Sequence, residues 1–175
     1  MNKITRVLDP SCKYIEDPHE VKIKYLTDCM KRNLPNLETC VYVLGSSSGK
    51  LNAESLSQRT IDICNEIGKE LAQVQNINIV TNGFYGTSDI VALTFVEQRK
   101  MLQKESNDSV IHIVPLKDSK DYSKKCRQEK DGNFEKVTYG QTYFFGETIK
   151  ERDSVIARLM DTCILIEGDK GRCIH

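Results

Sequence analysis

An apolar run that passes directly into a stretch of small residues constrains the fold of this chain more than any other feature. Residues 39–44 form the run, and Gly45, Ser46, Ser47, Ser48 and Gly49 follow it. The run is typical of a short buried strand, and the small residues allow backbone amides to approach an anion. Apolar residues at helical spacing come next, at Leu56, Ile63, Ile67 and Leu71. Strand, loop and helix N-terminus together predict a phosphate site, although an ordinary strand-to-helix turn has the same pattern.

The alternation of strand-like and helix-like segments continues to the end of the chain. We expect further strands at residues 77–80, 110–114, 139–145 and 163–166, and helices near residues 54–73, 88–104 and 147–160. This order predicts an α/β fold of the Rossmann-like type, with a mostly parallel sheet and helices on both faces. Ligands bind such sheets at the carboxyl ends of the strands, so loops remote in sequence can meet at one edge.

Two segments depart from this alternation. Residues 1–38 contain prolines around a helix-like patch, in which Val21, Tyr25 and Cys29 recur every four residues and share a face. We expect them to form an N-terminal extension to a domain that spans residues 39–175. Residues 117–136 are dense in charges of both signs, which is typical of a solvated loop; a mobile lid over a ligand is the alternative.

The composition limits the partners. Lys and Arg number 25 and Asp and Glu number 25, so we expect a small-molecule nucleotide as ligand, and no nucleic acid polymer or membrane. The sequence contains no apolar stretch as long as a membrane span, and a cytoplasmic location is expected.

The seven cysteines show no Cys-x-x-Cys spacing, which favours reduced thiols and no metal site. Cys40 and Cys163 adjoin apolar runs and are interpreted as small hydrophobes. His112 is interpreted as a packed strand residue in preference to a catalytic base.

Two more segments carry candidate binding residues. The loop at residues 81–89 follows a strand and precedes a helix, and it offers Gly83, Tyr85, Gly86 and Thr87 to a phosphate, ribose or base; a plain helix cap has the same residues. The last segment contains Arg152 early in a helix and a glycine turn with Gly168 and Gly171. A guanidinium there can hold a phosphate or a sugar, or form a surface salt bridge.

Taken together, these segments resemble the LOG family, nucleoside 5′-monophosphate phosphoribohydrolases also known as lysine decarboxylase-like proteins. Residues 40–49 resemble the opening strand and Gly-Ser-Ser-Ser-Gly loop of that family, and residues 80–86 resemble its Gly-Gly-Gly-x-Gly turn. Residues 113–115 are similar to the end of its central strand. Residues 149–171 resemble its Arg-Lys helix, its Asp-Ala strand entry and its Pro-Gly-Gly-x-Gly-Thr turn. The resemblance covers most of the chain after Thr39.

The resemblance implies hydrolysis of the N-glycosidic bond between a base and ribose 5-phosphate by a protein that is commonly a homodimer, without metal or redox cofactor. In that chemistry an arginine stabilises developing charge, and a glutamate after the Gly-Thr turn assists cleavage. Arg152 matches the arginine and is therefore the expected catalytic residue. The departures from the family are Asn82, Phe84, Asp153, Glu167, Asp169 and Arg172, and His175 at the glutamate position. We expect the domain to lack the helix that follows the last turn in the family, as in a fragment or a truncated isoform.

Three interpretations of the function remain open from the sequence. The chain is expected to bind a nucleoside 5′-monophosphate and to release free base and ribose 5-phosphate. The alternative is a non-catalytic nucleotide-binding sensor or regulatory domain of the same superfamily, since the altered third motif then needs no turnover. A partner-binding module with a vestigial pocket is a third reading.

Overall fold

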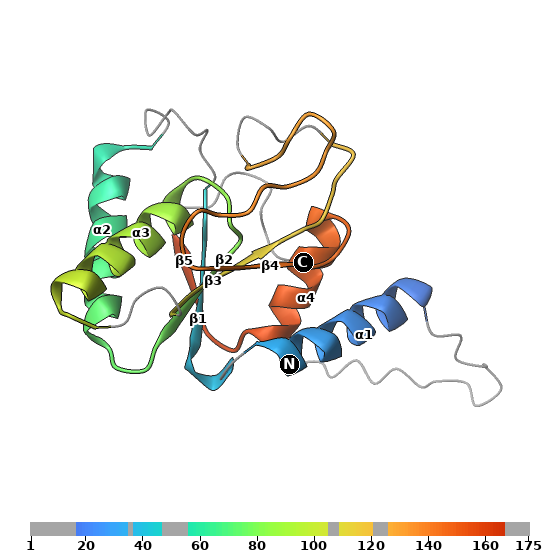
Figure 1. The fold of residues 1–175 in the computed structure, drawn as a ribbon, viewed down its shortest axis with the longest axis horizontal. Coiled ribbons are helices and arrows are strands. Elements are labelled where there is room, and N and C mark those ends of the chain that lie inside the picture. Colours follow the sequence, from blue (N-terminus) through green and yellow to red (C-terminus); the bar gives the residue numbers. More distant parts are fainter. Residues whose placement is uncertain (1–16, 35–36, 47–55, 105–108, 121–125, 167–175) are drawn as a thin grey trace, which may run out of the picture.

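Five strands of the described chain form a single parallel sheet in the order β4-β3-β2-β1-β5 (Figure 1). The computed structural model describes residues 17–34, 37–46, 56–104, 109–120 and 126–166. The strands are β1 (Cys40–Gly45), β2 (Asn78–Thr81), β3 (Val110–Val114), β4 (Gln141–Phe144) and β5 (Cys163–Ile166). Every neighbouring pair is parallel. The predicted α/β fold of the Rossmann-like type is confirmed.

The order of the strands reverses at β1. From β1 the chain adds β2, β3 and β4 on one side, and it then returns to place β5 on the other side of β1. In the β1–β5 register, Val43 lies opposite Ile164 and Gly45 opposite Ile166. A crevice forms at the carboxyl ends of strands where the order reverses, and ligands of open α/β sheets bind there. The topology therefore predicts a ligand site at the end of β1.

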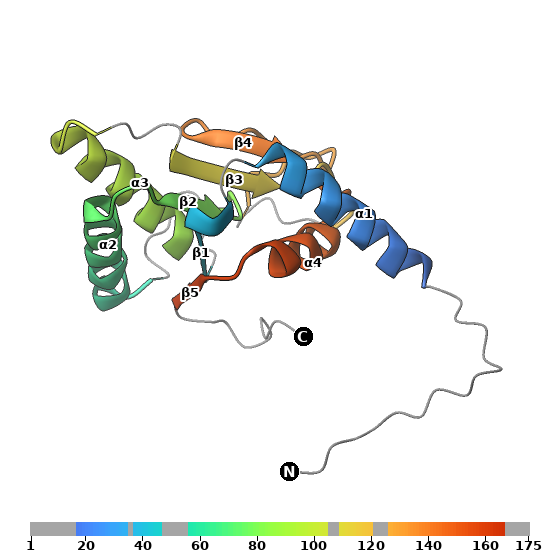
Figure 2. The same cartoon turned by 90° about the horizontal axis from the view of Figure 1, so that it is seen from below.

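Helices cover both faces of the sheet, as the sequence predicts. They are α1 (Pro18–Asn33), α2 (Gln58–Gln73), α3 (Thr87–Met101) and α4 (Ile149–Leu159), with a short 3-10 turn, η1 (Leu37–Thr39). Helices α2 and α3 pack together on one face, while α1 and α4 lie together on the other (Figures 1 and 2). Neighbouring residues of β1 point to opposite faces, so Tyr42 packs with α1 and α4 and Val43 with α2 and α3.

Side-chain caps explain where three of these helices begin. Asp17, Ser57 and Thr148 each accept a hydrogen bond from a backbone amide in the first turn of α1, α2 and α4. Such caps satisfy amides that have no partner inside the helix. Helix α3 differs, because Gly86 precedes it and provides no side-chain cap.

Helix α1 packs on α4 and contributes to the main core. Its buried residues are Ile23, Thr27 and Met30, and the hydroxyl of Thr27 donates to the carbonyl of Ile23, which satisfies this polar group. Val21 and Tyr25 are 45% and 65% exposed. The face that the sequence pattern singled out is therefore not the face that packs against the protein.

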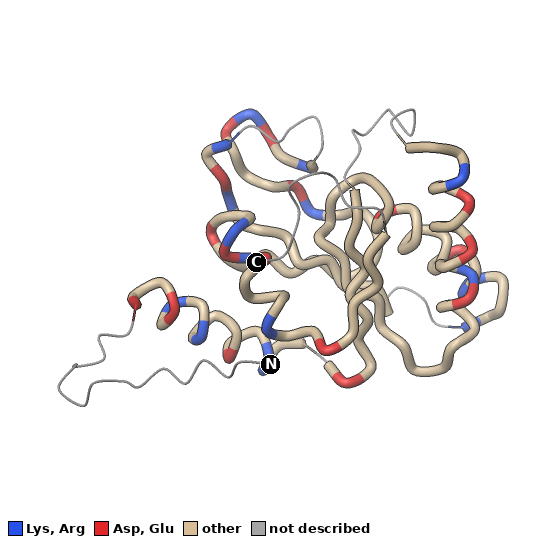
Figure 3. The backbone as a smooth tube through the Cα atoms, turned by 180° about the vertical axis from the view of Figure 1, so that it is seen from behind, with Lys and Arg blue, Asp and Glu red and all other residues tan. Residues whose placement is uncertain are grey.

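Charged residues lie on the helices and on the segment after β3, while the strands carry none (Figure 3). The described part of residues 117–136 does not behave as a simple solvated loop. Isolated antiparallel bridges join Lys117 to Asn133 and Gln128 to Phe134. Side chains from this segment form a small core with the turn after β2; its buried members are Phe84, Val114, Cys126, Phe134 and Val137. The helices of the described residues lack the combined length and apolarity that a bilayer crossing requires.

Candidate functional site

The turn between β2 and α3 is shaped by two polar side chains and two glycines. The hydroxyl of Thr81 accepts from the amide of Gly83 at 3.0 Å, and the side-chain oxygen of Asn82 accepts from the amide of Phe84 at 3.0 Å. Gly83 has φ +71°, and a Cβ there would lie 2.5 Å from a methyl group of Val114. Only glycine fits this combination of a left-handed backbone and close packing.

The end of β1 meets the first residue of α3. The carbonyl of Ser46 accepts from the amide of Thr87 at 3.0 Å and from its hydroxyl at 3.4 Å. Gly45 lies so close to the side chain of Thr87 and the carbonyl of Ile166 that a Cβ would clash with both. The structure thus brings together β1, β5 and the N-terminus of α3. Ser47, Ser48, Gly168 and Gly171 lie outside the described residues.

Arg152 is buried at the carboxyl edge of the sheet. Its side chain is 1% exposed, and Nη1 donates to the carbonyls of Asn82 at 2.8 Å and Ile113 at 3.1 Å. The guanidinium lies over the ring of Phe84, 4.7 Å from its centroid. Asp153 lies 2.8 Å from Nε as an ion pair that lacks hydrogen-bond alignment. Arg152 is therefore not a surface residue, and it holds the β2–α3 turn against the end of β3.

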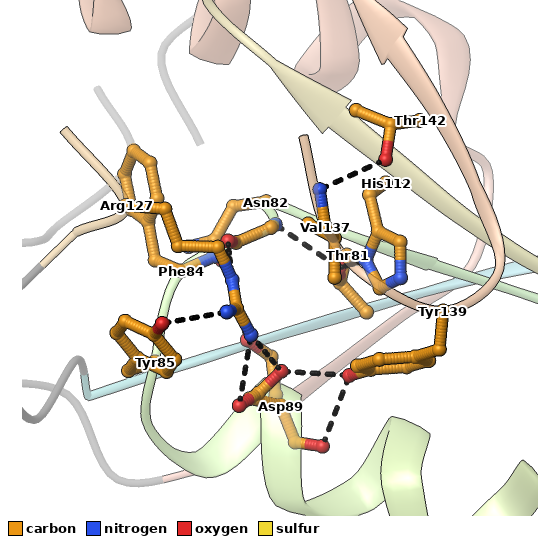
Figure 4. Close-up of polar contacts among 12 residues, drawn as sticks. Thr81, Asn82, Phe84, Tyr85, Asp89, His112, Arg127, Val137, Tyr139 and Thr142 are labelled. Carbon is orange, nitrogen blue, oxygen red and sulfur yellow. Dashed lines mark hydrogen bonds and ion pairs between the residues drawn. The ribbon is translucent and has the colours of Figure 1, made fainter. Parts of the chain in front are cut away.

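Arg127 is a site residue that the sequence analysis missed. Its guanidinium carbon lies 3.9 Å from the ring centroid of Tyr85, and Nη1 donates to the Tyr85 hydroxyl at 2.6 Å (Figure 4). Nε donates to the carbonyl of Gly83 at 3.3 Å, and Nη2 pairs with Asp89 at 3.2 Å. The side chain is 9% exposed. A charge-rich segment gives no reason to single out one arginine, although the apolar Cys126 beside it is compatible with an inward turn.

Asp89 and Tyr139 extend this polar cluster. The hydroxyl of Tyr139 donates to a carboxylate oxygen of Asp89 at 2.7 Å (Figure 4). Burial raises the pKa of Tyr139 above its ordinary value, and the adjacent charge of Asp89 raises it further. The phenol therefore stays protonated and acts as a donor at neutral pH.

His112 lies behind Tyr139 in β3. Its Nδ1 is 2.7 Å from the hydroxyl of Thr81, and its ring meets that of Tyr139 edge-on at 4.8 Å. Either atom of this pair can be the donor, according to the tautomer of the ring. Burial lowers the pKa of His112 to about 4; the backbone of Tyr139 opposes this shift, and the charge of Arg127 adds to it. A neutral, enclosed ring agrees with the interpretation of His112 as a packed strand residue.

Burial disfavours the thiolate form of two described cysteines. Burial raises the pKa of Cys40, opposed by Asn78, and burial also raises the pKa of Cys163. Cys163 is exposed in β5, so its environment is not the apolar one that the sequence suggested. Among the described residues, no three His, Cys, Asp or Glu side chains gather as a set of metal ligands.

The parallel sheet, the reversal of strand order at β1 and the polar cluster at its carboxyl edge define a Rossmann-type α/β protein. No protein family model and no curated protein matches the sequence. An X-ray structure of TM1055, a structural genomics target, is similar, with a TM-score of 0.51 and 24% identity over 76% of this chain and 63% of that chain. The Moco carrier protein from Chlamydomonas reinhardtii has a TM-score of 0.43 and 15% identity, over 75% of this chain and 64% of that chain.

These likenesses concern the fold. At 24% identity, the similarity to TM1055 shows a shared architecture. The likeness to the Moco carrier protein is too distant to support an argument. The chain spans 63% of the length of TM1055.

Proposed function

We propose that the chain binds a nucleoside 5′-monophosphate, or a related ribose phosphate, where β1 ends beside α3, and that it hydrolyses the N-glycosidic bond. The products are the free base and ribose 5-phosphate. The observation that carries the proposal is the convergence of three remote segments: the end of β1 at Ser46, the turn at Gly83 and the buried Arg152. The order of these segments is also the order in which the sequence resembles the LOG family.

The N-terminus of α3 supports binding of the phosphate. Gly86 precedes this helix without a side-chain cap, and the partial positive charge of a helix N-terminus favours an anion. Gly45 has no Cβ where β1 meets Thr87, and this allows the end of β1 to approach the first residue of α3 closely. The phosphate is therefore proposed to lie at the N-terminus of α3, beside the contact between Ser46 and Thr87, with Tyr85 beside the sugar or base.

Arg152 is the residue proposed to assist cleavage. Negative charge develops on the base as the N-glycosidic bond breaks. The guanidinium of Arg152 is held in place by two carbonyls and can stabilise this charge without moving. Its rigid placement is what this role requires.

One observation favours the alternative of a nucleotide sensor. Arg152 is 1% exposed, and its Nη1 already serves two backbone carbonyls. An arginine used in this way stabilises the turn even if it never meets a substrate. A sensor needs only the turn and the phosphate site.

Product analysis separates these proposals. The purified chain is incubated with the 5′-monophosphates of adenosine, guanosine, cytidine and uridine, and free base and ribose 5-phosphate are followed by chromatography. Arg152→Ala and Arg152→Lys are compared with Arg158→Ala, which removes an exposed arginine of the same helix that pairs with Glu20. Thermal unfolding of each variant shows whether it is folded.

Release of base by the wild type and by Arg158→Ala, but not by folded Arg152 variants, supports hydrolysis. Saturable binding without product refutes hydrolysis of these nucleotides and supports the sensor. Absence of both binding and product refutes the whole proposal.

A further inference from the structure

We propose that the carboxylate of Asp89 accepts a hydrogen bond from one of the vicinal hydroxyls of the ribose, with Arg127 and Tyr139 as positioning residues. This inference rests on the proposed function and adds a specificity for ribose over deoxyribose. It assigns a role to a carboxylate that neither the sequence motifs nor the proposed cleavage uses.

The position of Asp89 in the first turn of α3 supports this role. Thr87, the first residue of the helix, bonds toward Ser46 at the end of β1. Asp89 comes two residues later and faces Tyr85, Arg127 and Tyr139 instead (Figure 4). A ligand whose phosphate lies at the helix N-terminus beside Ser46 can thus place its sugar toward Asp89.

The two oxygens of the carboxylate are used unequally. Oδ1 accepts from Tyr139 at 2.7 Å and from Arg127 at 3.2 Å. Oδ2 has one contact in the described part of the chain, from Arg127 at 3.4 Å. Because each carboxylate oxygen has about two lone-pair sites, Oδ2 has capacity for one further donor. The side chain is 12% exposed, so the carboxylate is largely buried but still accessible to solvent.

The chemistry of the site favours a hydroxyl donor over a second anion at this point. A phosphate next to Asp89 would be repelled by the carboxylate, whereas the paired hydroxyls of ribose donate to carboxylates in many dinucleotide sites. Arg127 and Tyr139 fix the direction of the carboxylate from two sides. A fixed acceptor discriminates well, because a sugar that lacks the hydroxyl leaves it unpaired.

The test compares binding of each nucleotide with its 2′-deoxy and 3′-deoxy forms by calorimetry. We expect at least one deoxy form to bind wild-type protein about 10-fold more weakly, the size of a hydrogen bond to a charged acceptor. In Asp89→Asn, the ratio of ribo to deoxy affinity is expected to fall toward one. Asp62→Asn removes the same charge from an exposed site on α2 and should keep the wild-type ratio.

Two further variants guard against an effect of folding alone. Asp89→Glu keeps the charge but moves the oxygens, so it should lower the ratio while still pairing with Arg127. Tyr139→Phe keeps the carboxylate but removes the hydrogen bond from the Tyr139 hydroxyl to Asp89. A ratio of ribo to deoxy affinity between those of the wild type and Asp89→Asn is expected. Thermal unfolding is measured for each variant, and only folded variants are compared.

The outcomes separate this inference from the proposed function. If wild-type protein binds ribo and both deoxy nucleotides equally, the inference is wrong and nucleotide binding stands. If folded Asp89→Asn and Asp89→Glu both keep the wild-type ratio, another group reads the sugar and the inference is again wrong. If no nucleotide binds to the wild type, both proposals fail.

Discussion

Arg152 in α4 donates a 2.8 Å hydrogen bond to the carbonyl of Asn82 at the end of β2. From the other side, Nε of Arg127 donates to the next carbonyl, that of Gly83, at 3.3 Å. Two arginines from different segments thus hold consecutive carbonyls of one turn. This turn determines where α3 begins, so the geometry of the candidate site depends on both side chains.

Removal of the buried guanidinium should destabilise the protein. In Arg152→Ala, the carbonyls of Asn82 and Ile113 lose their donor and a cavity opens beside Phe84. We expect the free energy of unfolding to fall by about 3 kcal/mol, measured by urea denaturation. Arg158→Ala, which breaks an exposed ion pair, should cost less than about 1 kcal/mol. Equal losses in the two variants would show that Arg152 does not act as a buried clamp.

His112 should make stability fall in mild acid. Its pKa is lowered from 6.5 to about 4 in the folded chain, so between these values the unfolded chain takes up a proton that the folded chain refuses. The contribution of His112 to stability is fully present above pH 6.5, the pKa in the unfolded chain. It is lost as the pH falls toward about 4, the pKa in the folded chain. We expect a loss of about 2 kcal/mol from pH 7.5 to pH 5, measured by urea denaturation.

The control for this pH effect is His112→Gln, which has no titrating ring at the same place. The variant should be less stable than the wild type at pH 7.5. The difference between their free energies of unfolding should be smaller by about 2 kcal/mol at pH 5. Parallel stability curves for the two proteins would assign the acid sensitivity to other groups.

The Arg127–Asp89 pair should show strong energetic coupling. Both side chains are nearly buried, and each has a tyrosine partner of its own: Tyr85 for Arg127 and Tyr139 for Asp89. A double-mutant cycle with Arg127→Gln and Asp89→Asn is expected to give a coupling energy of about 2 kcal/mol in urea unfolding. The exposed pair Lys69–Glu66 on α2 serves as the reference and should give about 0.5 kcal/mol or less. Similar coupling in both pairs would contradict a rigid cluster at the site.

Gly45 should not tolerate a methyl group. In Gly45→Ala, the new Cβ would clash with the side chain of Thr87 and with the backbone of Ile166. We expect a loss of about 1–3 kcal/mol, because β1 and β5 must separate to admit it. The double variant Gly45→Ala with Thr87→Ala removes the clashing hydroxyl but not the backbone contact, so partial recovery relative to Thr87→Ala alone is expected. Differential scanning calorimetry provides the measurement, and an unchanged melting temperature for Gly45→Ala would refute the close approach.

Much of the fold could be predicted because buried strands and their spacing are local signals. Residues 110–114 and 163–166 form strands with the bounds that their apolar runs indicate. The packed face of α1 could not be predicted in this way. Periodicity indicates that residues share a face, but not which face meets the protein, and the buried Thr27 is acceptable only because its hydroxyl bonds within the helix.

The candidate site was less predictable than the fold. Glycines and small residues predict the turn after β2, because Gly83 has a backbone conformation that other residues rarely adopt. Arg127 lacks a comparable signal. Its inward orientation depends on Tyr85, Asp89 and the small core around Phe134, which only the folded chain brings together.

The place of β5 in the sheet has a consequence for synthesis. Because β5 pairs with β1 although β2, β3 and β4 lie between them in the chain, the sheet at β1 is completed only after Cys163–Ile166 has left the ribosome. A nascent chain that ends after β4 has an open edge on β1, and such edges invite pairing between unfinished molecules. Closure of this long loop is also entropically costly. The same late pairing that completes the sheet therefore ends the period in which the growing chain is open to aggregation.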